Sequence, residues 1–95
     1  MMKLNDFEIE VLANLPVAPI GLSIPELADG LLAKRDPQAR SKISVALNTI
    51  SAILGVICVT IGNDDFGNCG VVLYGVRALD MPLVRRFCAR AGYYR

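Results

Sequence analysis

A long uncharged stretch, residues 43–62, is the feature that most constrains the fold of this chain. It is about long enough to span a bilayer as a helix, but polar residues such as Asn48 and Thr49 interrupt it. The stretch also changes character at Gly55, from apolar residues at helical spacing to a β-branched run at 56–61. We therefore predict a buried helix followed by a buried strand, and no membrane segment.

The helix and strand signals elsewhere predict one α+β domain that spans 1–95. Capping residues and apolar residues at three- and four-residue spacing predict helices at 6–15, 24–34, 37–54 and 81–91. Two runs rich in β-branched residues predict strands at 56–61 and 71–76. The connection at 62–70 is rich in Gly, Asn and Asp, which predicts a projecting hairpin loop.

The side-chain inventory argues against an enzyme. The chain has 95 residues, a net charge of +1 and no His, so it lacks the usual general base and the commonest zinc ligand. Its three cysteines form no C-x-x-C pair: Cys58, Cys69 and Cys88. We predict no enzymatic activity, no cofactor and no metal, and a cytoplasmic protein whose thiols stay reduced.

The order of elements resembles the winged helix-turn-helix family over nearly the whole chain, from Asn5 to Gly92. The most specific stretch, similar to the family's recognition helix and the strand after it, is RSKISVALNTISAILGVI at 40–57. The sequence IPELA at 24–28 is similar to the family's second helix. The resemblance implies a winged helix with an added C-terminal helix. It also implies a small DNA-binding transcriptional regulator that docks helix 37–54 in the major groove and uses the hairpin as a wing.

Charge is segregated along the chain: 1–33 and 43–76 are acidic, whereas 34–42 and 77–95 are basic. Because phosphate neutralisation supplies much of the affinity for double-stranded DNA, we expect contact at the basic start of the recognition helix. Short polar side chains on its outer face can approach base edges, and Asn pairs with adenine. The predicted DNA contacts are Lys34, Arg35, Arg40, Ser41, Lys42, Ser44, Asn48 and Thr49. A solvated helix start and a neutral face that packs on another helix are the alternative interpretation.

The predicted wing departs from the family pattern, because it carries Asp64 and Asp65 and no cation. Carboxylates repel phosphates, so we do not expect this loop on the DNA backbone. Asp64, Asp65 and Phe66 are instead candidates for a protein partner, with Phe66 more readily explained as tucked onto the domain. The loop lacks the spaced ligands and closing Glu of a calcium site. The alternative function is a winged-helix protein-interaction module or inhibitor that acts through this acidic wing and the neutral helix face, without DNA.

The predicted C-terminal helix has an outward face with three cations, Arg85, Arg86 and Arg90. These contact phosphates, or they pair with the acidic N-terminal segment of the same or another subunit. A homodimer through this helix would use Leu83, Phe87 and Tyr93-Tyr94. The favoured alternative is that Leu83 and Phe87 simply close the small core.

Overall fold

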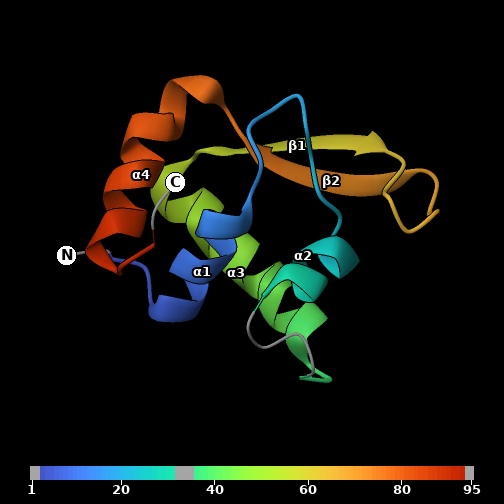
Figure 1. Cartoon of the computed structure of the whole chain (residues 1–95), viewed down its shortest axis with the longest axis horizontal. Helices are drawn as coiled ribbons and strands as arrows, with labels where there is room; N and C mark the ends of the chain where they lie inside the picture. Colours follow the sequence, from blue (N-terminus) through green and yellow to red (C-terminus); the bar gives the residue numbers. More distant parts are fainter. Residues whose placement is uncertain (1–2, 32–35, 94–95) are drawn as a thin grey trace.

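The computed structural model of this chain describes residues 3–31 and 36–93. The elements in order are α1 (Asp6–Asn14), α2 (Ile24–Gly30), α3 (Ala39–Leu54), β1 (Ile57–Gly62), β2 (Val71–Val76), the 3-10 helix η1 (Ala78–Asp80) and α4 (Met81–Arg90). The described part is therefore α+β, with four α-helices and one antiparallel hairpin (Figure 1). This confirms the predicted class and the predicted order of helices and strands.

Local hydrogen bonds explain why most boundaries agree with the sequence. Asn5 and Glu8 form a capping box at the start of α1, and Ser23 and Glu26 form one at the start of α2. At the other end of α3, Gly55 adopts a left-handed conformation with φ of 63° and ends the helix. The long uncharged stretch therefore divides at Gly55 into α3 and β1, as predicted. Among the described residues, no helix is both long enough and apolar enough to cross a membrane.

The start of α3 differs from the prediction by two residues. The sequence predicts a helix from Pro37 with Asp36 as its N-cap, whereas α3 begins at Ala39 and its N-cap position is Gln38. The Asp36 carboxylate accepts a hydrogen bond from the backbone N–H of Gln38 at 2.8 Å, and this closes a turn just before the helix. The helix predicted at 24–34 is also shorter, since α2 ends at Gly30.

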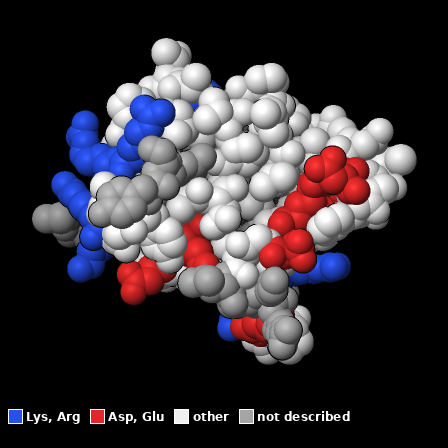
Figure 2. All heavy atoms as spheres, viewed as in Figure 1, with Lys and Arg blue, Asp and Glu red and all other residues white. Residues whose placement is uncertain are grey.

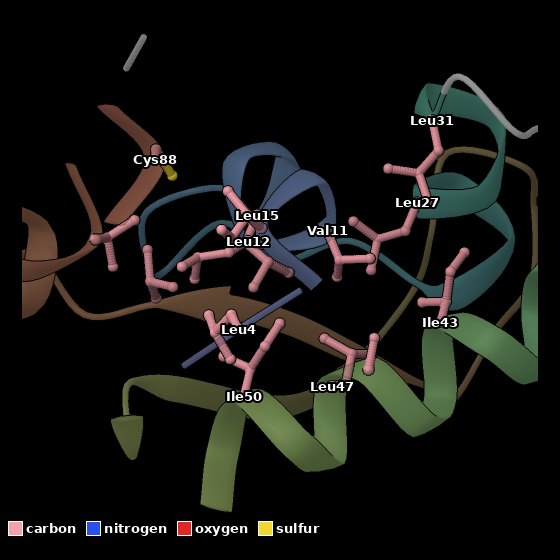
Figure 3. Close-up of a cluster of buried hydrophobic side chains, with 14 of the residues drawn as sticks. Leu4, Val11, Leu12, Leu15, Leu27, Leu31, Ile43, Leu47, Ile50 and Cys88 are labelled. Atoms are coloured by element: carbon pink, nitrogen blue, oxygen red, sulfur yellow. The ribbon is translucent and has the colours of Figure 1, made fainter. Parts of the chain in front are cut away.

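The core lies between α3 and the other helices. Helix α1 packs on α3 and α4, and α2 packs on α3. Figure 3 shows the buried side chains that meet there, among them Leu12 and Leu15 of the α1 region, Leu27 of α2 and Ile50 of α3. The charged residue Glu10 of α1 is also buried.

Strand β2 of the two-stranded sheet forms backbone hydrogen bonds along both of its edges. On one side it pairs with β1, from Ile57 opposite Val76 to Gly62 opposite Val71. On its other side β2 receives the connection between α1 and α2, which hydrogen-bonds to Tyr74 and Val76. Strand β1 is therefore left at the edge of the sheet.

Candidate nucleic-acid interface on α3

Helix α3 has one buried face and one face open to solvent. Its buried side chains are Ala39, Ile43, Ala46, Leu47 and Ile50, and they hold the helix against α1 and α2. The opposite face carries small or uncharged exposed residues: Ser41, Ser44, Val45, Asn48, Ser51 and Ala52. Three of the predicted base contacts, Ser41, Ser44 and Asn48, therefore share one solvent-facing side of a regular helix, as a groove-reading element requires.

Thr49 is less available than these three residues. Its side chain is half-buried, and its hydroxyl donates a hydrogen bond to the backbone oxygen of Val45 at 3.1 Å. The hydroxyl's proton is therefore used inside the helix.

The cations at the start of α3 are not equivalent. Arg40 is exposed on the first turn, whereas Lys42 Nζ lies 2.6 Å from Asp36 Oδ2. Hydrogen bonds from Lys42 and from the Gln38 backbone lower the pKa of Asp36 below its ordinary value, so the Asp36 carboxylate is ionised at neutral pH. Lys34 and Arg35, the other two predicted phosphate contacts, lie outside the described residues.

The loop after β1 is anchored to α2 through Asp64. The Asp64 carboxylate accepts hydrogen bonds from Ser23 Oγ at 2.8 Å and from Asn68 Nδ2 at 2.9 Å. It also accepts from the backbone N–H groups of Phe66 and Asn68. These hydrogen bonds hold the pKa of Asp64 below its ordinary value. The largest effect comes from the Asn68 side chain, followed by the Asn68 backbone N–H, the Ser23 hydroxyl and the Phe66 backbone N–H.

This arrangement corrects the role given to Asp64. The residue was a candidate contact for a protein partner, but only 8% of it is exposed, and its carboxylate is occupied by loop and α2 donors. It is a structural residue, because it joins the loop to the helix N-terminus that Ser23 caps. Asp65 remains exposed, and its backbone N–H donates to Glu26 Oε2 at 3.2 Å.

Phe66 lies beside the start of α3 rather than in the core. With 55% of its surface exposed, it lines a groove of about 370 Å³ together with residues of α2 and the start of α3, among them Asp29, Asp36 and Arg40. The favoured expectation that Phe66 tucks onto the domain is therefore met only in part. The groove brings together Arg40 and Phe66, which the sequence assigned to different partners.

The arginines of α4 lie far from the start of α3. Figure 1 places α4 at one end of the long axis and the first turn of α3 toward the other end. On the face drawn in Figure 2, Lys and Arg atoms gather over α4, and Asp and Glu atoms gather over α2 and the loop after β1. On that face the Lys and Arg atoms over α4 lie apart from the other Lys and Arg atoms in view.

The apolar side of α4 is already occupied. Val84 and Cys88 are buried, and Leu83, Phe87 and Tyr93 pack against the same core. This supports the interpretation that Leu83 and Phe87 close the core, and it leaves the cations of α4 as its outward face. Tyr94, part of the predicted dimer contact, lies outside the described residues.

Comparison with family models, with curated proteins and with solved structures finds no match to this chain.

Two features of the site follow no signal in the sequence. The Ser23–Asp64 hydrogen bond joins residues 41 positions apart, and the contact from Asp65 to Glu26 joins residues 39 apart. An Asp in a Gly-rich loop is compatible with an Asx turn, in which its carboxylate accepts from the backbone N–H two residues on, here that of Phe66. This local pattern concerns the loop alone and does not point to the contacts with α2.

Proposed function

We propose that this chain is a winged-helix DNA-binding protein, and that α3 docks in the major groove of double-stranded DNA. The observation that carries the proposal is the solvent-facing side of α3. It offers Ser41, Ser44 and Asn48 along one face and Arg40 at its start. With α2 packed behind it, α3 takes the place of a recognition helix and the hairpin takes the place of a wing.

The contacts divide into two kinds. Arg40 contacts phosphate and supplies affinity without sequence preference. Asn48 lies further along the helix and reads a base edge, where a bidentate Asn–adenine pair contributes about 1–3 kcal/mol of discrimination. The loop after β1 stays off the DNA backbone, because Asp65 is exposed and would face phosphate oxygens.

The test is binding to a labelled mixed-sequence duplex, followed by fluorescence anisotropy at several salt concentrations. We expect affinity to fall steeply with salt, and Arg40→Ala to weaken binding and reduce the salt slope by about 1. Arg86→Ala is the matched control, since it removes the same charge from an exposed position on α4, away from α3. Absence of duplex binding at low salt, or equal losses in both variants, contradicts the proposal.

Sequence reading is tested separately. Selection from a random duplex pool should enrich a site for the wild-type chain, and Asn48→Ala should relax the preference at one position while leaving non-specific binding unchanged. An unchanged preference at every position would remove Asn48 from the proposed contacts.

A second candidate function, a protein-interaction module, is favoured by one observation. Val45 is 64% exposed in the middle of the outer face of α3. It borders an apolar groove of about 470 Å³ that Phe7, Ala46 and neighbouring residues also line. Exposed apolar surface beside a groove is typical of protein contacts.

The two candidate functions predict opposite effects of the Val45→Lys substitution. An added cation on α3 strengthens duplex binding if this face meets phosphates, but it abolishes recovery of a specific protein if the groove holds an apolar partner. For the loop, Asp65→Lys is the usable variant in a pull-down, because Asp64 is needed for the loop's own structure.

A further inference from the structure

Strand β1 has one edge that pairs with nothing in the described part of the chain. The inner edge of β1 pairs with β2. No backbone or side-chain group among the described residues hydrogen-bonds to its outer edge. Strand β1 and the connection between α1 and α2 pair with opposite edges of β2.

The pairing of β2 shows which β1 groups point outward. Tyr74 exchanges both of its backbone hydrogen bonds with Leu22, at 2.8 and 2.9 Å, and Val76 bonds to Pro16 and Ala18. The backbone N–H and C=O groups of Tyr74 and Val76 therefore point away from β1. Their partners in β1 stand in the non-hydrogen-bonded pairs of the hairpin, so the backbone groups of these partners point outward. Those partners are Val59, opposite Tyr74, and Ile57, opposite Val76, and the alternation adds Ile61.

The side chains of β1 include none of the charged or proline residues that prevent pairing at natural edge strands. Natural edge strands are protected by charges, Pro, bulges or a covering segment, yet β1 contains neither a charged residue nor Pro. Val59 is 57% exposed and Ile61 is 69% exposed, and both project from the same face as Val72 of β2.

We propose that β1 is the interface of a homodimer, in which two copies pair antiparallel through their β1 edges and form one four-stranded sheet. A two-fold axis sets each strand against itself, so a charged edge would face like charge, whereas this one does not. If the axis passes beside Val59, Val59 lies opposite Val59 of the second copy, and Ile57 lies opposite Ile61 of the second copy. Every outward backbone group of these residues then has a hydrogen-bond partner. Each cross-strand pair on that face is then apolar and β-branched.

The other candidate surface for a second copy is less suitable. Pairing α4 with α4 across a two-fold axis would bring Arg85, Arg86 and Arg90 of both copies together, and these residues are exposed. The apolar residues of α4 are already packed on the core. The dimer predicted through the C-terminal helix is therefore replaced by one through β1.

Sedimentation velocity over a wide range of protein concentration tests the dimer, without DNA. We expect the wild-type chain to reach twice its monomer mass and to do so equally at low and high salt. Val59→Pro removes an outward N–H while leaving the β1–β2 hydrogen bonds intact, and Ile61→Lys adds a charge at the edge; both should stay monomeric. Leu79→Lys is the control, since Leu79 is 91% exposed on η1, and this variant should dimerise normally.

A cross-link tests the register even if an edge variant folds poorly. In the proposed register Thr60 faces Cys58 of the other copy as a non-hydrogen-bonded pair, with Cα atoms about 4.5 Å apart, which suits a disulfide. Mild oxidation should therefore join two copies of the Cys69→Ser, Thr60→Cys double variant but not of Cys69→Ser alone. The proposal is overturned by a wild-type monomer at all concentrations, by a dimer that salt dissolves, or by edge variants that dimerise like the wild type. Failure of DNA binding would leave it standing.

Discussion

Asp64 is the residue that most changes the interpretation of the loop after β1. It stands in a Gly-rich loop and has the composition of a solvated turn residue, yet four hydrogen bonds converge on its carboxylate. Two of them come from the loop backbone and one from the residue that caps α2. A single carboxylate therefore fixes both the shape of the loop and its position against the helix.

We predict that Asp64→Asn destabilises the protein at neutral pH and flattens the acid side of its stability profile. The pKa of Asp64 lies below the ordinary 3.8 in the folded state. Its contribution is therefore present above the unfolded pKa and is lost as the pH falls through the folded pKa. Urea unfolding at several values between pH 7 and pH 2.5 measures this.

Asp36→Asn is the control for that prediction, since the pKa of Asp36 is also lowered but its partner Lys42 is half-exposed. We expect a smaller loss from Asp36→Asn, because exposed ion pairs contribute little. If Asp64→Asn keeps the wild-type dependence on pH, the hydrogen bonds to Asp64 do not stabilise the fold as inferred.

Gly75 is the second residue whose role depends on a distant segment. A Cβ atom at this position would lie 2.7 Å from the backbone oxygen of Ile20 and 3.1 Å from that of Pro16. We predict that Gly75→Ala destabilises the protein by about 1–3 kcal/mol, because backbone must move to admit the methyl group. Gly30→Ala is the control in the same thermal unfolding measurement. Its Cβ would meet only Asn14 Oδ1 at 3.5 Å, so a comparable loss there would contradict the steric explanation.

At the scale of elements, α3 has a buried face and an opposite exposed face. Ile43 and Ile50 are fully buried and hold the helix in the core, while Ser44 and Asn48 are exposed. This division separates the residues that hold the core from those that we propose bind DNA, because changes on one face leave the other in place.

We predict that Ile50→Ala costs about 2–5 kcal/mol of unfolding free energy, whereas Asn48→Ala stays within about 0.5 kcal/mol. Chemical denaturation of both variants checks this. A large loss from Asn48→Ala would mean that the outer face packs against something, which would argue against its use for reading DNA.

At the scale of the whole molecule, the helices differ in how they are held. Helix α4 packs on α1 at one end of a molecule that measures 38 Å along its longest axis, and Cys88 lies buried at that contact. Cys69 is exposed in the loop after β1, and Cys58 is half-buried on β1.

We predict that a thiol reagent modifies Cys69 at once, Cys58 more slowly and Cys88 only when α4 opens or the protein unfolds. Mass spectrometry of peptides after timed alkylation measures the three rates. Rapid labelling of Cys88 in the native protein would mean that α4 is not docked on α1 as described.

The amino-acid sequence by itself determined the elements whose bonds are local. The capping boxes at Asn5 and Ser23 and the stop at Gly55 join residues three or four positions apart, so a linear pattern records them. The outer face of α3, with Ser44 and Asn48, was equally readable, because helical periodicity alone decides which side chains share a side.

The tertiary structure decided where distant segments meet. It buried Asp64 through a donor 41 positions away, paired the connection between α1 and α2 with β2, and set α4 apart from the start of α3. Within residues 3–31 and 36–93, it also left one edge of β1 unpaired. No local pattern encodes these outcomes, because each depends on which segments the closed core brings together. The sequence thus predicts the helix that we propose reads DNA, while only the folded chain shows how the loop is anchored to α2 and which strand lies at the edge of the sheet.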